Sequence, residues 1–251
     1  MTYARRAVSE LHPATRGFGL AADAYERGRP DYPADAIAFV GERLDLGPGR
    51  TVVDLAAGTG KLTRLLVPTG ADVIAVEPIA EMRAKIEHAR VLEGTAEAIP
   101  LPDASADAVT IAQAFHWFRF RDALVEIHRV LRPGGGLALI WNVRDEREPI
   151  HAAVSAILLP LEHDVPRRHR HPWLEVLDES GLFTSAEKTT FSHEQLVDED
   201  GLVERFMSVS FVAAADAETR ADVEARLRAL ARDMGTPIRL PYVTDVYLAF
   251  S

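Results

Sequence analysis

A glycine-rich turn with acidic residues placed around it is the part of this sequence best suited to chemistry. The stretch VVDLAAGTGKLTRLL covers residues 52–66, where Asp54 ends an apolar run and Gly58 and Gly60 precede a helix-like pattern. Glycines lack a Cβ atom, so the backbone can turn tightly there and approach a ligand closely. Glu77 stands 19 residues after Gly58, at the end of the next apolar run, where an acid accepts both hydroxyls of a ribose. This spacing predicts a nucleoside-containing ligand.

Three kinds of nucleoside ligand compete for this turn. A phosphate-binding P-loop needs glycine at position 55 and Ser or Thr at position 62, and both positions are leucine. A dinucleotide fits less well, because Thr63 stands where the third glycine of its motif belongs and Asp54 would lie near a pyrophosphate. That alternative stays open. S-adenosylmethionine has a ribose, an adenine and a cationic amino-acid tail but no phosphate, and it suits Asp54 best.

Short β-branched apolar runs alternate with longer amphipathic segments, which is typical of an α/β fold. Helices are predicted over 62–70, 79–89 and 120–135, and strands at 51–56, 71–78, 90–94, 106–115 and 136–142. Parallel strands linked by helices bind ligands at their carboxyl ends. The site should therefore form from Glu77 and from the strand-end segments 54–60, 93–97, 112–116 and 141–142.

Composition limits the possible partners. The 251 residues have a formal net charge of −10, which disfavours binding to a nucleic-acid backbone. The absence of cysteine excludes disulfides, thiolate catalysis and zinc–thiolate sites. No stretch approaches the roughly 18 apolar residues that a membrane span requires. We therefore expect a cytoplasmic protein, monomeric or homodimeric, that binds a small molecule and neither nucleic acid nor membrane.

Six motifs in order carry a resemblance to a known family. They are FGLAADAYERGRPDYP (18–33), VVDLAAGTGKLT (52–63), VIAVEP (73–78), EGTAEAIPLPDASADAV (93–109), AQAFHWF (112–118) and VLRPGGGLALIWN (130–142). Together they resemble a class I S-adenosylmethionine-dependent methyltransferase of the ubiquinone/menaquinone-biosynthesis and trans-aconitate-like small-molecule branch. The resemblance implies a Rossmann-like, seven-stranded, mostly parallel sheet flanked by helices, with an antiparallel last strand and a helical insertion over the active site. It also implies S-adenosylmethionine as cofactor and S-adenosylhomocysteine as product.

The resemblance also assigns roles to residues. It implies that segment 54–60 lines the methionine end of the cofactor, that Glu77 holds the ribose and that Ile79 packs on the adenine. The full set of implied cofactor-binding residues is Asp54, Ala56, Gly58, Thr59, Gly60, Glu77, Pro78, Ile79, Thr95, Ala96, Gln113 and Trp117.

Two positions depart from the family pattern. Ala56 occupies the place of the first motif glycine, which is tolerable if its φ is negative. Thr95 stands where the family commonly has an aspartate that accepts from the adenine amine, and a hydroxyl accepts less strongly. Weaker cofactor binding, or binding through backbone groups, would follow.

Methyl transfer from S-adenosylmethionine needs few catalytic groups from the protein. Methyl transfer from a sulfonium is an in-line displacement, so alignment and exclusion of water supply most of the catalysis. His116 is the candidate base, or the group that positions the acceptor, if the acceptor is a phenol or an acidic carbon. Tyr25 and Arg29 are predicted in an N-terminal flap, with Arg29 available for a carboxylate. Simple packing of this flap on the sheet edge explains the same residues equally well.

The remaining sequence predicts a single methyltransferase domain over 1–251, with 18–142 as the cofactor-binding core. Helical insertions that form a cap are expected at about 143–180 and 196–238, and the final strand at 239–251. The basic stretch RRHRH (167–171), with His163, could suggest a metal site, but it lacks a carboxylate or thiol at ligand spacing, so we expect no metal. Two alternatives remain: a cofactor-binding accessory protein without catalysis, and an NAD(P)-dependent oxidoreductase.

Overall fold

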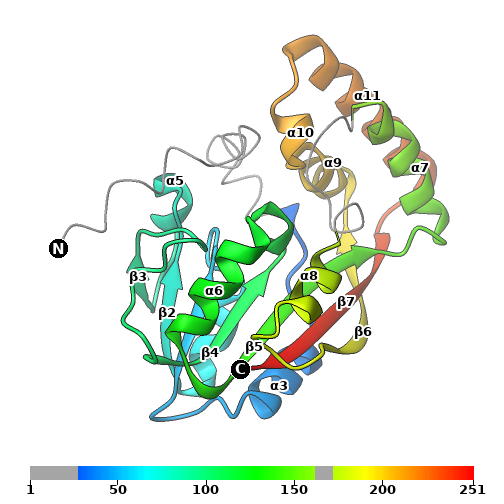
Figure 1. Ribbon diagram of the computed structural model, residues 1–251. Coiled ribbons are helices and arrows are strands. Elements are labelled where there is room, and N and C mark those ends of the chain that lie inside the picture. The colour runs from blue at the N-terminus through cyan, green and yellow to red at the C-terminus, as the bar shows by residue number, and fades with distance from the viewer. Residues whose placement is uncertain (1–27, 162–171) are drawn as a thin grey trace.

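A seven-stranded sheet forms the centre of the molecule (Figure 1). The computed structural model describes residues 28–161 and 172–251. The strand order is β3-β2-β1-β4-β5-β7-β6, and only β7 runs antiparallel to its neighbours. The mostly parallel sheet with an antiparallel last strand is therefore confirmed. The strands are β1 (Thr51–Leu55), β2 (Asp72–Val76), β3 (Arg90–Leu92), β4 (Ala106–Ala112), β5 (Leu131–Arg144), β6 (Glu187–Val197) and β7 (Ile238–Phe250).

Helices cover both faces of the sheet and one of its ends. The α-helices are α3 (Ala34–Arg43), α4 (Thr63–Leu66), α5 (Ala80–Arg83), α6 (Phe120–Val130), α7 (Pro149–Leu158), α8 (Trp173–Glu179), α9 (Glu199–Met207), α10 (Ser210–Ala213) and α11 (Ala217–Met234). Single 3₁₀ turns are η3 (Val67–Thr69), η4 (Phe115–Trp117) and η5 (Leu159–Leu161). No helix in these described segments is long and apolar enough to cross a membrane.

One face of the sheet packs against α6 and α8. The apolar residues of α6 recur at helical spacing, so Leu124, Ile127 and Val130 all face the sheet and are buried. Trp173 of α8 lies on the same face, and its ring centroid is 4.8 Å from that of Trp141 in β5. The opposite face is covered by α3 and α4, which bury a second cluster of apolar residues. Both faces of the central strands are thus dry, which explains their continuous apolar runs.

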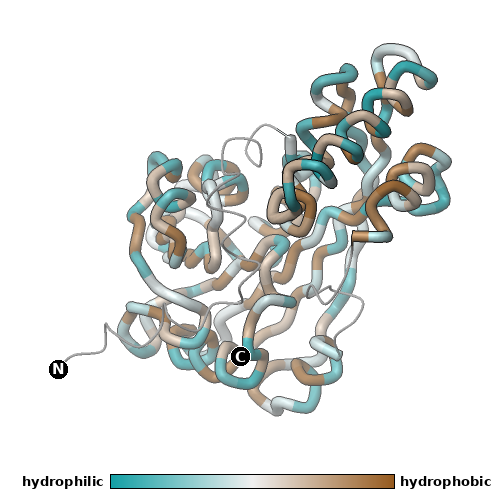
Figure 2. Tube along the Cα trace, turned by 90° about the horizontal axis from the view of Figure 1, so that it is seen from above, coloured by the Kyte–Doolittle hydropathy of each residue, from teal (hydrophilic) through white to brown (hydrophobic). Residues whose placement is uncertain are grey.

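A separate cluster of helices forms a cap at the carboxyl end of β5. Helices α7, α9, α10 and α11 share one apolar core, which also contains Leu240 and Tyr242 from the start of β7 (Figure 1). Strand β5 is longer than the 136–142 predicted from sequence, because its pairing with β7 continues to Arg144 opposite Tyr242. Figure 2 shows these helices projecting beyond the sheet. The extended strands β5 and β7 therefore place the cap beyond the edge of the sheet where the parallel strands end.

The segment after β2 differs from the predicted helix over 79–89. Helix α5 contains only Ala80–Arg83, because the next amides of Lys85 and Ile86 bond three residues back instead of four. His88 then has a φ of 63°, in the left-handed region that ends a helix. The shortened helix brings Ile86 against the glycine turn, where a Cβ on Gly60 would lie 3.4 Å from its side chain.

Candidate functional site

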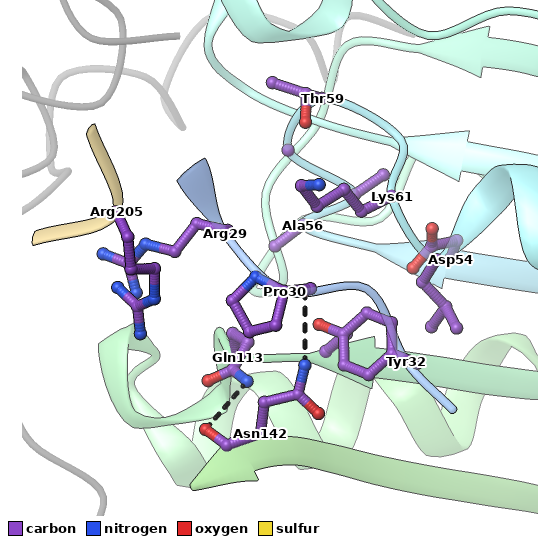
Figure 3. A pocket seen from close by; sticks show the side chains of 14 residues that line it. Arg29, Pro30, Tyr32, Asp54, Ala56, Thr59, Lys61, Gln113, Asn142 and Arg205 are labelled. Carbon is purple, nitrogen blue, oxygen red and sulfur yellow. Dashed lines mark hydrogen bonds between the residues drawn. The ribbon is translucent and has the colours of Figure 1, made fainter. Parts of the chain in front are cut away.

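A small pocket with a cavity volume of about 50 Å³, open to solvent at its mouth, lies where β1, β4 and β5 end (Figure 3). Figure 3 shows Asp54 at one end of it and the side chains of Arg29 and Arg205 at the other. The carboxyl edge predicted from sequence is therefore hollow at this point. The lining residues are Arg29, Pro30, Tyr32, Asp54, Ala56, Ala57, Gly58, Thr59, Lys61, Leu62, Ala112, Gln113, Asn142 and Arg205.

Asp54 is a buried carboxyl group at the end of β1. Its side chain is almost fully enclosed, and its Oδ2 accepts a 2.6 Å hydrogen bond from the Thr63 hydroxyl at the start of α4. Its Oδ1 is buried without a hydrogen-bond partner. Burial raises the pKa of Asp54 to about 7, against the hydrogen bond from Thr63 that favours the ionised form. Buried acceptors normally have a hydrogen-bond partner, so the Asp54 Oδ1 beside the pocket is a candidate to accept a hydrogen bond from a ligand.

The glycine turn has a left-handed backbone at three positions. Gly58 has a φ of 60° and Gly60 a φ of 85°. Ala56 has a φ of 57°, so the condition under which the sequence made alanine tolerable here, a negative φ, is not met. A left-handed alanine is strained by a contact between its Cβ and the carbonyl oxygen, which costs about 1–2 kcal/mol. Strain of this kind is stored at functional sites when the surroundings hold the backbone in place.

Ala56→Gly should therefore stabilise the protein by about 1 kcal/mol, because glycine adopts this φ without strain. The neighbouring Ala57→Gly is the matched control, because Ala57 does not have a positive φ. That control should lose about 0.5–1 kcal/mol through added freedom of the unfolded chain. Urea unfolding measures both. A loss of stability in both variants would contradict the strain at Ala56.

Glu77 connects β2 to the glycine turn. It is buried, and its Oε2 accepts from the Gly58 amide at 2.8 Å while its Oε1 accepts from the Ile79 amide at 2.8 Å. Burial raises the pKa of Glu77, and the two amide bonds oppose that shift. Each carboxylate oxygen keeps a further lone pair that can accept from a ligand hydroxyl. The Glu77 side chain therefore holds the glycine turn in place, and its carboxylate can still accept hydrogen bonds from a ligand.

Gln113 lies at the end of β4, with a φ of 58°. Its amide nitrogen Nε2 donates to the Asn142 carbonyl oxygen at 3.2 Å. The Asn142 side chain in turn donates to the carbonyls of Pro30 (3.3 Å) and Asp31 (3.1 Å) and accepts from the Thr244 hydroxyl at 2.7 Å. This chain of bonds joins β4, β5 and β7 to segment 28–33, which forms one wall of the pocket.

Not every predicted site residue reaches this pocket. The lining includes Asp54, Ala56, Gly58, Thr59, Gln113 and Arg29. Outside the lining lie Gly60, Glu77, Pro78, Ile79, Thr95, Ala96, His116 and Trp117. Thr95 and Ala96 are buried beside a short bridge from Thr95 to Ala98. Their binding roles, like those of the pocket residues, stay predictions.

The candidate catalytic residues do not lie together in the pocket: Arg29 lines it and His116 does not. His116 and Trp117 form η4 after β4, with ring centroids 5.4 Å apart. Arg29 lines the pocket, whereas Tyr25 lies outside the described residues, as do His163 and the basic stretch 167–171. Among residues 28–161 and 172–251, no group of three His, Asp or Glu side chains could hold a metal ion.

Two cationic residues of the pocket were missed by the sequence reasoning. Lys61 is buried, and its Nζ lies 3.2 Å from Oδ1 of Asp31. Its place directly after the glycine turn was a usable signal. Arg205 comes from α9 in the cap and carries no local signal, because only the packing of α9 on segment 28–33 brings it to the pocket. A Cβ on Gly28 would lie 2.8 Å from the Arg205 Cα, so the two backbones touch.

Comparison with known proteins identifies the family. A family model described as a methyltransferase domain matches residues 53–139. An uncharacterized methyltransferase of Mycobacterium tuberculosis is 44% identical over 201 residues, which are 72% of this chain and 77% of that protein. The chain belongs to the class I S-adenosylmethionine-dependent methyltransferases.

Solved structures of other methyltransferases share the fold. A protein of Anaeromyxobacter dehalogenans assigned as a type II methyltransferase superposes with a TM-score of 0.62 at 25% identity, covering 89% of this chain and 97% of that one. A phosphoethanolamine N-methyltransferase of Haemonchus contortus, solved with S-adenosylhomocysteine, has a TM-score of 0.54 at 14% identity, covering 93% of this chain and 57% of that one. The pocket of this methyltransferase thus lies in a fold that its relatives also have.

Proposed function

We propose that this methyltransferase transfers a methyl group from S-adenosylmethionine to a small-molecule acceptor. The observation that carries the proposal is the buried carboxyl of Asp54, whose Oδ1 has no partner, at the base of a left-handed glycine turn. A buried acceptor at this point suits the ammonium of an amino-acid tail and disfavours a pyrophosphate. The residues present therefore fit the proposed cofactor better than a dinucleotide.

The proposed binding roles follow from chemistry. Asp54 would hold the ammonium, Arg29 or Lys61 the carboxylate, and Glu77 the ribose hydroxyls through its remaining lone pairs. Pro78, Ile79, Thr95 and Ala96 would surround the adenine, as the family resemblance implies. When bound, S-adenosylmethionine supplies a methyl group already activated on a sulfonium.

The chain's own contribution is alignment and the exclusion of water. The bonds from Asn142 to the carbonyls of Pro30 and Asp31 hold segment 28–33 in place as a wall, and Arg205 of the cap closes another side. His116 is the proposed proton acceptor for a phenol or an acidic carbon, and a carboxylate acceptor would need no base. Whether an oxygen, a nitrogen or a carbon atom is methylated depends on the acceptor molecule.

Isothermal titration tests the proposal. The purified protein should bind S-adenosylmethionine and S-adenosylhomocysteine in the micromolar range and show no heat with NAD. Tight NAD binding without a response to either sulfur nucleoside would contradict the methyltransferase reaction and favour an NAD(P)-dependent oxidoreductase. Binding of the sulfur nucleosides, followed by a screen with radiolabelled methyl donor in which no small molecule is methylated, would favour an accessory protein without catalysis.

A further inference from the structure

Arg205 is a buried cation whose charge is not matched by the protein around it. The residue is 6% exposed, and its Nε donates to the Tyr242 hydroxyl at 2.9 Å. The guanidinium carbon lies 4.9 Å from the Phe206 ring centroid and 5.7 Å from that of Tyr242. Its Nη1 is buried without a hydrogen-bond partner, and in the described part of the chain no carboxylate pairs with it. The Tyr242 hydroxyl and the rings of Phe206 and Tyr242 therefore fix the orientation of the guanidinium, and its Nη1 can still donate a hydrogen bond to a ligand.

That donor belongs to the pocket. Arg205 lines the same cavity as Arg29 and Lys61, and Figure 3 shows the side chains of Arg205 and Arg29 together at the end opposite Asp54. The two other cations have contacts within the protein: Lys61 pairs with Asp31, and Arg29 donates through Nη2 to the Ser208 carbonyl at 3.3 Å, although its Nε is buried without a hydrogen-bond partner. A buried guanidinium without a counter-charge is costly, so its retention at this position indicates a ligand that supplies the charge.

We propose that Arg205 binds an anionic group of the methyl acceptor, a carboxylate or a phosphate monoester. The inference rests on the function proposed above. One cofactor carboxylate needs one cation, and Arg29 and Lys61 already offer two, so the charge of Arg205 is available to a second molecule. An arginine fork matches the planar pair of oxygens in either anion.

The position of Arg205 in the cap supports an acceptor rather than the cofactor as its ligand. Helix α9 belongs to the apolar core of the cap, whereas the glycine turn belongs to the sheet. The contact of Gly28 with the Arg205 backbone fixes α9 against the pocket wall. Arg205 therefore acts as a specificity residue that selects a charged acceptor over a neutral one.

The test uses the complex with S-adenosylhomocysteine and three probes of similar shape: benzoate, phenyl phosphate and benzyl alcohol. Affinities are measured by ligand-observed NMR at constant ionic strength. At least one charged probe should bind in the millimolar range and at least tenfold more tightly than benzyl alcohol. The preferred charged probe tells carboxylate from phosphate.

Arg205→Gln should reduce this preference to less than threefold and change the affinity for S-adenosylhomocysteine by less than threefold. Arg226→Gln is the matched control, since it removes the same charge from an exposed position on α11 of the cap and should keep the preference. If the glutamine variant does not fold, Arg205→Lys keeps the charge without the fork and should weaken the charged probe about tenfold.

Several outcomes would overturn the assignment: equal binding of benzyl alcohol, no binding of either charged probe, or equal losses in the Arg226 control. A loss of S-adenosylhomocysteine binding on Arg205→Gln as large as the loss of probe binding would assign the guanidinium to the cofactor instead. A wild-type protein that does not bind S-adenosylhomocysteine at all refutes the proposed function, which is a different result.

Discussion

Glu77→Gln should weaken the binding of S-adenosylhomocysteine at least tenfold. The buried carboxylate accepts from the Gly58 and Ile79 amides through different oxygens. A glutamine side chain has one carbonyl oxygen, so its NH₂ group would face one of these two donors. A buried amide left without an acceptor costs about 1–3 kcal/mol. The glycine turn would move, and the proposed ribose site would lose an acceptor at the same time.

Titration calorimetry measures this loss, and urea unfolding separates it from a general loss of stability. Glu93→Gln is the matched control, because Glu93 also follows a strand end but is exposed and pairs with Arg83 at 2.9 Å. We expect that control to bind within twofold of wild type. If Glu77→Gln is destabilised but binds S-adenosylhomocysteine normally, Glu77 is a structural residue that fixes the loop and has no part in ribose binding.

The affinity for S-adenosylhomocysteine should rise with pH between about 6 and 8, by up to tenfold per pH unit. Burial raises the pKa of Asp54 to about 7, so the ligand-free protein holds a neutral carboxyl below that pH. The ammonium of the ligand favours the carboxylate, so binding at pH 6.5 should release a proton. Calorimetry in two buffers with different ionisation enthalpies counts the protons released. Asp54→Asn should abolish the pH dependence, and a slope that persists in this variant would exclude Asp54 as its source.

The same pKa predicts the stability of the ligand-free protein. The folded pKa is raised from 3.8 to about 7, so between these values the unfolded chain is ionised while the folded protein keeps its proton. The contribution of Asp54 is therefore complete below the unfolded pKa and is lost as pH rises through 7. At about 1.4 kcal/mol per pH unit, the loss between pH 5 and pH 7 amounts to roughly 3 kcal/mol. Relative to wild type, Asp54→Asn should be more stable at pH 8 than at pH 5 by this amount in urea unfolding.

Local signals were sufficient to predict the sheet and the edge of the sheet at which the pocket lies. The alternation of strands and helices, the glycine turn and the spacing to Glu77 depend on neighbours in the chain, so the sequence predicted them without tertiary contacts. The family resemblance rests on the same local motifs and predicted the antiparallel last strand, which β7 confirms. Asp54 and Gln113 lie in the pocket because strand ends meet at one edge.

The sign of a backbone angle and the length of a helix needed the folded structure. From sequence, alanine at position 56 was tolerable only with a negative φ, and the sequence did not give the sign; in the folded protein the φ of Ala56 is 57°. Helix α5 is shorter than its apolar pattern predicts, since Ile86 packs against the glycine turn instead of continuing the helix. In both cases contacts made elsewhere in the fold outweigh the local preference.

By itself, therefore, the sequence determined the fold class, the family resemblance and the edge of the sheet at which a ligand should bind. Only the tertiary structure decided that Glu77 holds the glycine turn with both carboxylate oxygens, that Asp54 is buried with a free acceptor, and that Arg205 joins Arg29 in one pocket. The physical reason is that burial and hydrogen bonding depend on groups from different elements, which meet only when those elements pack together; for Arg205, the cap must pack on segment 28–33.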